Sequence, residues 1–517
     1  MKPMNIKKLA SLLFQRSVIV AALILVQAAL IIGMLALSSA GYSYVRWGSL
    51  VLSVLAVLII VSRQTDPGYK IAWIVPILLF PAFGWLLYLL CGGNKLSARQ
   101  RRKMQGMDRT MLEQLEQDYK AEELNRFGPE AANQARYLEQ YARCPVYSNT
   151  VTRYFPLGDD VFPVMLEELK KAEKYIFLEY FIIAPGVFWD SIVEILREKH
   201  AAGVDVRVIY DDVGSLNTLP MNYAHKFEAE TGIPCCFFNR FKPIISIRMN
   251  NRDHRKFCII DGHTAFTGGI NLADEYINQK PRFGHWKDSA ILLKGEAAWS
   301  MTVMCLTLWE YIGDGAEDYS RCRRAARPAA AAGGAGYYVQ PYTDNPLDDE
   351  PVGETVYLNL ISKAKRYLYV MTPYLIVSDS VNTALCNAAK AGVDVRIITP
   401  HIPDKPLVFE LTRSHYEPLL EAGVQIFEYT PGFVHAKNMV VDDLCAVVGS
   451  INLDYRSMFL HFEDAVLLYR DPTILDVKRD FLETQFKSQP VTLEECLAHA
   501  WPRRLFRSIL RVLAPLL

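Results

Sequence analysis

The stretch HRKFCIID occupies residues 254–261, and a second stretch, HAKNMVVD, occupies residues 435–442. In both, lysine stands two positions and aspartate seven positions after the histidine. Further on, GGIN (268–271) and GSIN (449–452) place a glycine and an asparagine at equal distances from each histidine. Unrelated segments would not keep one spacing across such polar residues, so the chain contains an internal repeat.

The sequences around the two motifs are also similar. KAEKYIFLEYFII begins at Lys171 and KAKRYLYVMTPYLI at Lys363, and each predicts a helix end that leads into a buried strand. AGVDVRVIY begins at Ala202 and AGVDVRIIT at Ala391, and each predicts a helix end, a glycine cap and a second strand. Helical lengths of about ten to fifteen residues between such strands are typical of βαβ units. The sequence therefore predicts an α/β fold with two similar units related by a pseudo-twofold axis.

Composition limits the classes of protein that fit this chain. Its 517 residues are too many for one core, and its 56 basic residues equal its 56 acidic residues, so no overall attraction to nucleic acid follows. The ten cysteines have no metal-ligand spacing and predict reduced, buried thiols. We expect six parts: a transmembrane anchor region (1–93), a charged helical connector (94–144), a first unit (145–325), an Ala/Gly-rich linker (326–336), a second unit (337–495) and a basic amphipathic C-terminal segment (496–517).

Two uncharged apolar stretches, 17–37 and 71–91, are long enough to span a bilayer, and a weaker one covers 47–62. The first lacks a cleavage site and predicts an anchor instead of a removed signal peptide. Basic clusters flank the region on both sides, and the positive-inside rule places both in the cytoplasm. Two spans with an interfacial 47–62 satisfy this rule, whereas three would put the body outside. We expect a multi-pass protein of the bacterial cell membrane with a cytoplasmic catalytic body.

The C-terminal stretch 501–517 carries four arginines among Leu, Ile, Val and Phe. Two interpretations fit it equally well. It is either an interfacial amphipathic helix or an ordinary helix that packs on the body.

If the two motifs converge, they bring together two imidazoles, two ammonium groups and two amides: His254, Lys256, Asn271, His435, Lys437 and Asn452. This set suits a phosphate group, whose oxygens accept charge-assisted hydrogen bonds. One imidazole can attack phosphorus, and the other can protonate the leaving alkoxide and then act as a base. The lysines neutralise the phosphate charge, so no metal or other cofactor is expected.

The paired motifs, with GGIN and GSIN, resemble the phospholipase D superfamily, and the chain is similar to its bacterial cardiolipin synthase branch. That similarity also covers DPGYKIAWIVPILLFPAFGWLLYLL (66–90), LEYFII (178–183), HWKDS (285–289), TPYLI (372–376) and DYRSMFLHFE (454–463). The resemblance implies a transfer between two phosphatidylglycerol molecules that yields cardiolipin and glycerol through a phosphohistidine. It implies phosphatidylglycerol and membrane lipids as partners, and the apolar spans and neutral charge predict no nucleic acid.

The resemblance also implies roles for single residues. It favours His254 as the nucleophile and His435 as the acid and base. It implies that acidic residues further on orient these imidazoles across the twofold, Glu463 beside His254 and Asp288 beside His435.

The motif aspartates, Asp261 and Asp442, complete the expected catalytic motifs. They stand at strand ends, where we expect them to hold backbone or link the two halves instead of carrying protons.

Alternatives remain open on sequence grounds. The same residues serve a phospholipase D-type hydrolase that uses water, or a transphosphatidylase with another alcohol. A nuclease would share the motifs, but the apolar spans and neutral charge argue against it. A scaffold without catalysis is disfavoured because both motifs are complete.

Overall fold

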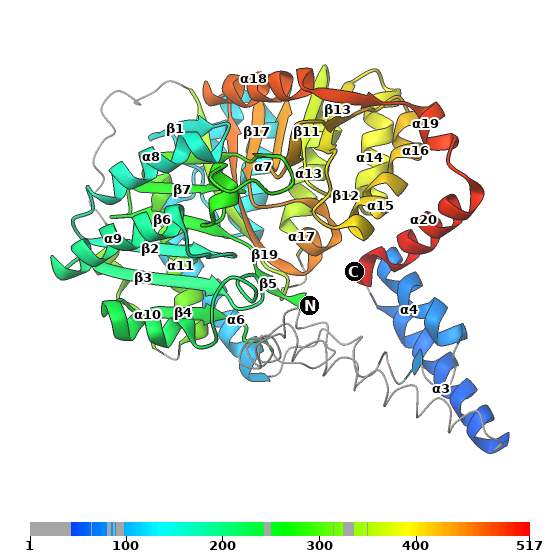
Figure 1. Cartoon of the computed structure of the whole chain (residues 1–517), viewed down its shortest axis with the longest axis horizontal. Helices are drawn as coiled ribbons and strands as arrows, with labels where there is room; N and C mark the ends of the chain where they lie inside the picture. The colour runs from blue at the N-terminus through cyan, green and yellow to red at the C-terminus, as the bar shows by residue number, and fades with distance from the viewer. Residues whose placement is uncertain are drawn as a thin grey trace, which may run out of the picture.

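The computed structural model describes residues 43–63, 65–79, 84–85, 88, 98–241, 250–313, 315–323, 336–348 and 350–516. Two β-sheets, each with its own helices, form the two halves of the body (Figure 1). The first has the strand order β1-β9-β7-β6-β2-β3-β4, and the second has β10-β19-β17-β16-β11-β13-β14-β20. The orders correspond strand for strand, with β20 added, so the predicted α/β repeat is confirmed.

The elements of the first unit are β1 (Thr150–Phe155), α8 (Gly158–Leu169), β2 (Tyr175–Tyr180), α9 (Val187–Ala201), β3 (Asp205–Asp211), α10 (Tyr223–Thr231), β4 (Cys235–Phe238), β5 (Arg252–Asp253), β6 (Lys256–Ile260), β7 (Thr264–Gly268), η4 (Asp274–Ile277), β8 (His285–Lys287), β9 (Ala290–Gly295), α11 (Ala297–Ile312) and α12 (Tyr319–Cys322). Every side chain of β2 and β6 is buried, as expected for central strands covered on both faces.

The elements of the second unit are β10 (Tyr338–Asp344), α13 (Val352–Lys363), β11 (Tyr367–Met371), β12 (Leu375–Ile376), α14 (Asp379–Lys390), β13 (Asp394–Pro400), α15 (Pro406–Ser414), α16 (Tyr416–Glu421), β14 (Gln425–Tyr429), β15 (Gly432–Val434), β16 (Asn438–Val441), β17 (Cys445–Gly449), β18 (Leu453–Asp454), α17 (Tyr455–Phe459), β19 (His461–Tyr469), α18 (Thr473–Phe486), β20 (Ser488–Val491) and α19 (Leu493–Leu497). The predicted strands at AGVDVRVIY and AGVDVRIIT are β3 and β13.

The motif aspartates fix the backbone of each half. Asp261 accepts hydrogen bonds from the backbone N–H groups of residues 173–175, at 3.0, 2.7 and 2.9 Å. Asp442 does the same for residues 365–367, at 2.7, 2.8 and 2.8 Å. Each carboxylate thereby joins the end of the motif strand to the start of β2 or β11 within its own half. We expected these aspartates either to hold backbone or to link the two halves. Their contacts hold backbone within one half.

Two short parallel ladders connect the halves. β5, just before the first motif, pairs with the start of β19, and β15, just before the second, pairs with β8. The backbone N–H of His254 donates to Phe462 at 2.9 Å, and that of His435 donates to Lys287 at 2.7 Å. Each motif histidine is therefore held one residue away from the acidic position of the opposite half.

The largest core cluster is shared by both units and includes Phe257 and Ile291 of the first with Met439 and Val447 of the second. Before it in the chain come α6 (Ala98–Leu115), η1 (Glu116–Asp118), η2 (Ala121–Phe127) and α7 (Pro129–Tyr141). α6 packs on α11, which contacts both sheets. The nine cysteines in the described part are free thiols, as expected from their spacing.

The expected spans are only partly covered by the described residues. Stretch 17–37 and most of the linker 326–336 lie outside them, and stretch 71–91 is described only as far as the end of α4 (Pro67–Leu79) and at residues 84, 85 and 88. The weaker stretch forms α3 (Ser43–Ser62). Across the part of the chain that is described, none of the helices combines the length and apolarity needed to cross a membrane.

The C-terminal helix α20 (Trp501–Leu513), followed by η5 (Ala514–Leu516), combines features of both expected interpretations. Arg503 and Arg507 pair with Glu410 of α15, so the helix packs on the body through its arginines. The opposite side exposes apolar residues, among them Leu505 and Ile509. α4 contacts both α20 and η5, and these elements lie together at one end of the molecule (Figure 1).

The ladder between β8 and β15 offers a direct test of how the halves are held. A Cβ at Gly432 would lie 2.2 Å from the carbonyl oxygen of His285, so backbone must move in Gly432→Ala. Because His435 follows three residues later, we expect activity to fall on the order of 100-fold, as displacements of about 1 Å do in active sites. Gly106→Ala in α6 is the control, since its Cβ meets nothing within 4 Å. Unchanged turnover in Gly432→Ala would show that this ladder does not position His435.

Candidate active site

Each motif histidine pairs with a carboxylate from the other half of the chain. His254 Nδ1 lies 3.0 and 2.9 Å from the two oxygens of Glu463, and His435 Nδ1 lies 2.6 Å from Oδ2 of Asp288. These are the pairs expected from the sequence. Glu463 at Nδ1 of His254 retains the proton there, so the lone pair of the neutral His254 imidazole is on Nε2. Nδ1 of His435 faces both Asp288 and Nζ of Lys437, which lies 2.8 Å away.

Burial and the paired carboxylates set the charges of these groups. Burial holds the pKa of His254 well below its ordinary value and lowers the pKa of His435 to about 4. For Asp288 and Glu463, burial opposes ionisation, but the facing imidazoles outweigh it and bring each pKa below its usual range. At neutral pH the site therefore holds neutral imidazoles beside ionised carboxylates, which suits nucleophilic attack.

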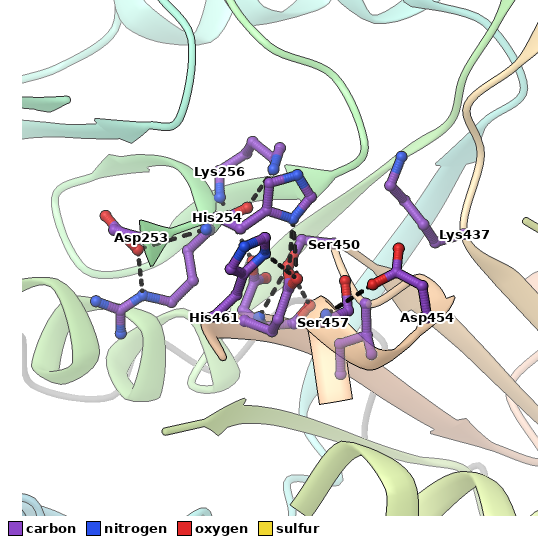
Figure 2. A network of polar contacts seen from close by, with 12 residues as sticks. Asp253, His254, Lys256, Lys437, Ser450, Asp454, Ser457 and His461 are labelled. Atoms are coloured by element: carbon purple, nitrogen blue, oxygen red, sulfur yellow. Dashed lines mark hydrogen bonds and ion pairs between the residues drawn. The ribbon is translucent and has the colours of Figure 1, made fainter. Parts of the chain in front are cut away.

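The two motif lysines are buried within the same site. Each ammonium group donates to the backbone carbonyl of its own motif histidine. Burial lowers the pKa of Lys437 to about 7 and that of Lys256 to about 8, with the site carboxylates opposing the shift. Lys256 also contributes to the low pKa of His435, so the two motifs influence each other electrostatically. Figure 2 shows Lys437 across from His254 and Lys256.

The two motif asparagines have different surroundings. Asn271 accepts from the backbone N–H of Ile182 at 3.0 Å and donates to the Tyr276 hydroxyl at 2.8 Å. Its amide therefore already has protein partners at both ends. Asn452 is 5% exposed and its Oδ1 has no hydrogen bond in the described structure. Phosphate binding by both asparagines stays a prediction, and the contacts favour Asn452.

The site contains side chains that the sequence analysis did not select. Ser450 Oγ donates to Glu463, whereas the corresponding position, Gly269, would place a Cβ 2.0 Å from Asp288. His461 packs beside His254 with ring centroids 5.4 Å apart (Figure 2). Comparing GGIN with GSIN, and residue 461 with residue 286, reveals these differences in the sequence itself.

The strands that carry the two histidines differ in chemistry. Around His254, Arg255 pairs with Glu179 at 2.8 Å and with Asp253 at 3.1 Å, all buried. Around His435 the neighbours are aromatic: Tyr276, Trp286 and Phe433 have ring centroids 5.5, 5.6 and 5.9 Å from it. Phe181 has its ring centroid 5.0 Å from that of His254, so the two halves differ in how many aromatic rings surround the histidine, although the backbone is repeated.

One group in the described structure has donors close enough for a metal ion. Donor atoms of His254, His461 and Glu463 all lie within 4.8 Å of one another. The hydrogen bonds between His254 and Glu463 account for part of this proximity. The arrangement as a whole offers a nucleophilic imidazole, a second imidazole for proton transfer and two ammonium groups for an anion, which is the equipment for phosphoryl transfer.

Comparisons with known proteins match this architecture. The family model described as "Cardiolipin synthase, PLD-like domain" matches residues 165–281 and 357–484, one segment in each unit. A second model, "Phospholipase_D-nuclease N-terminal", matches residues 51–93.

Similar proteins extend over most of the chain. An uncharacterised protein of Streptococcus mutans is 43% identical over 89% of this chain and 99% of its own length. A cardiolipin synthase of Geobacillus kaustophilus is 34% identical over 90% of this chain and 92% of its own. The crystal structure of a phosphatidylserine synthase from Haemophilus influenzae has the same fold, with a TM-score of 0.57 and 16% identity over 74% of this chain and 98% of that one. The chain belongs to the cardiolipin synthase family of the phospholipase D superfamily.

Proposed function

We propose that this protein is a cardiolipin synthase, a phosphatidyltransferase that converts two phosphatidylglycerol molecules into cardiolipin and glycerol. The observation that carries the proposal is the pair of histidines, each bonded at Nδ1 to a carboxylate of the opposite half. This arrangement supports a reaction in which one histidine is the nucleophile and the other carries protons around a single phosphate.

In the first step, Nε2 of His254 attacks the phosphorus of a bound phosphatidylglycerol. The bond from phosphorus to the glycerol oxygen breaks, and His435 gives that oxygen a proton from its own Nε2. A bound phosphodiester anion raises the low pKa of His435, because its negative charge favours the imidazolium. The His254 ring becomes cationic on phosphorylation and is stabilised by Glu463 at 2.9 Å.

In the second step, the terminal hydroxyl of another phosphatidylglycerol attacks the phosphohistidine. His435, now neutral, takes the hydroxyl proton, and the bond from phosphorus to His254 breaks. One phosphodiester replaces another, so the reaction is reversible and needs no nucleotide. Lys256 and Lys437 donate to the phosphate oxygens throughout, and no step uses a metal.

The choice of acceptor distinguishes this function from its nearest alternative. If water attacked the phosphohistidine, the product would be phosphatidic acid, as in a phospholipase D-type hydrolase. The aromatic groups around His435 favour a lipid acceptor, since apolar walls near the attacking oxygen reduce the access of water.

We also propose that the N-terminal region anchors the enzyme in the cell membrane as a multi-pass segment, with the body on the cytoplasmic side. Support comes from the uncharged stretch 17–37 and from the many exposed apolar side chains of α3: Leu50, Val51, Leu52, Val54, Leu55, Leu58, Ile59 and Val61. α20, which also exposes apolar side chains, contacts α4. Lipid substrates would then reach the site by lateral diffusion.

Purified protein in phosphatidylglycerol vesicles, with EDTA and no nucleotide, tests the reaction. We expect equal amounts of cardiolipin and glycerol from the wild type and a loss of at least about 1,000-fold in His254→Ala, because the nucleophile is gone. Lipid mass spectrometry and a glycerol assay measure both products. Phosphatidic acid in place of cardiolipin would identify a hydrolase, and no lipid turnover would contradict the proposal.

The proposed membrane anchor has its own test. The protein should remain with the vesicles after an alkaline carbonate wash.

The buried lysines predict an unusual pH dependence of anion binding. A lysine is cationic below its pKa, so Lys437 loses its charge as the pH rises through about 7. We expect the inhibition constant of sulfate, which does not titrate in this range, to rise about tenfold or more between pH 6 and 9, because one charged hydrogen bond is lost.

Lys437→Arg is the matched variant, because arginine keeps its charge over this range. Its sulfate inhibition constant should begin to rise only near pH 8, where Lys256 titrates. A sulfate inhibition constant that stays flat to pH 9 in the wild type would contradict the assignment.

A further inference from the structure

His461, at the start of β19, is a third imidazole in the site, with no assigned role. It is 8% exposed, and its Nδ1 lies 3.5 Å from Oε1 of Glu463. Neither ring nitrogen has a hydrogen bond of ordinary geometry within the described structure. Leaving two buried ring nitrogens without close partners is costly, so the fold retains this histidine against a penalty in stability.

The internal repeat supplies a natural comparison for this position. His254 bonds to the backbone of Phe462 as His435 bonds to that of Lys287, so His461 corresponds to Trp286. Trp286 packs on His435 with ring centroids 5.6 Å apart. Its indole N–H has no hydrogen-bond partner in the described structure, so it does not bond to Asp288. The half that carries Glu463 therefore has a polar ring where the other half has an apolar one.

The two carboxylates are also held differently. Asp288, with the shorter side chain, accepts a backbone hydrogen bond from Ser289 at 2.8 Å. The Glu463 carboxylate is instead held by the side chains of His254, Ser450 and His461. Ser450 lies at Oε2 and His461 at Oε1, so they flank the carboxylate on two sides. A glutamate has an extra rotatable bond and requires such flanking groups to stay aligned with one imidazole.

We propose that His461 is a positioning residue for the reaction at His254. Its Nδ1 faces Oε1 of Glu463 at 3.5 Å and, together with the Ser450 hydroxyl, keeps the carboxylate against Nδ1 of His254. The inference rests on the proposed phosphohistidine chemistry. Its effect is greatest when His254 carries the phosphatidyl group and is cationic, because a misaligned carboxylate then stabilises the ring less. His461 therefore acts on kcat, and the affinity for lipid stays unchanged.

Two substitutions of His461 distinguish the contribution of its N–H donor from that of its planar ring. His461→Phe keeps a planar ring without a donor, whereas His461→Asn places an amide N–H near the position of Nδ1. We expect kcat to fall about tenfold in His461→Phe, the value of one hydrogen bond to a charged group, with KM within about twofold. His461→Asn should stay within about threefold of the wild type. The thermal midpoint of each variant is measured first, and His461→Leu replaces His461→Phe if the latter does not fold.

A double-mutant cycle with Glu463→Gln tests whether His461 affects kcat through the Glu463 carboxylate. If His461 acts through Glu463, adding His461→Phe to Glu463→Gln lowers kcat less than about twofold, whereas independent effects would multiply. A tenfold further loss, an increased KM, or His461→Phe with the kcat of the wild type would each overturn the proposal.

A chemical readout keeps this test separate from the proposed function. Diethyl pyrocarbonate transfers an ethoxycarbonyl group to a nucleophilic imidazole nitrogen, and peptide mass spectrometry reports the rate at His254. We expect this rate to fall in His461→Phe and to be restored in His461→Asn, even in protein that turns over no lipid. Equal rates in the wild type and His461→Phe would overturn the positioning role without bearing on the lipid reaction.

Discussion

Each motif imidazole depends on a carboxylate that belongs to the other half of the chain. Glu463 faces His254 and Asp288 faces His435, with all four groups buried. A buried imidazole that becomes cationic during a reaction needs a nearby negative charge, and a buried carboxylate needs donors. Neither half satisfies both requirements alone. This mutual dependence explains why one phosphate requires the motif twice.

Backbone geometry allows each half to supply the carboxylate that faces the histidine of the other half. The β5–β19 and β8–β15 ladders place each histidine one residue from the opposite carboxylate position. Within each half, Asp261 or Asp442 ties the motif strand to its neighbour through three backbone N–H groups. The site is thus held by main-chain contacts on both sides. Side chains are then free to differ, with the Arg255–Glu179 pair next to His254 and more aromatic rings around His435.

Repetition made much of this predictable from sequence. The equal spacing of the two motifs predicted two α/β units, and both sheets have the same strand order. The histidine–carboxylate pairs also followed, because the resemblance supplied the pairing and the duplicated positions located it. Residues without a duplicate were harder to interpret. His461 has a tryptophan as its counterpart, so a search for residues that are identical in the two halves passes over it.

Other features depend on contacts that no local pattern contains. Asn271 and Asn452 have equal spacing, yet the partners of Asn271 are Ile182 and Tyr276, which only the fold brings close. The arginines of α20 predicted a polar face, but the direction of that face depends on Glu410, about ninety residues earlier. Such long-range pairings follow from tertiary structure.

The central claim is that His254 carries the phosphatidyl group between two lipids. The most direct test is rapid quenching at alkaline pH of wild-type protein mixed with phosphatidylglycerol, followed by peptide mass spectrometry. The account predicts a phosphatidyl adduct on the peptide with His254, absent from His254→Ala and reduced in His435→Ala, because His435 protonates the leaving glycerol. An adduct on the His435 peptide of the His254→Ala protein, with none on His254 in any variant, would contradict it.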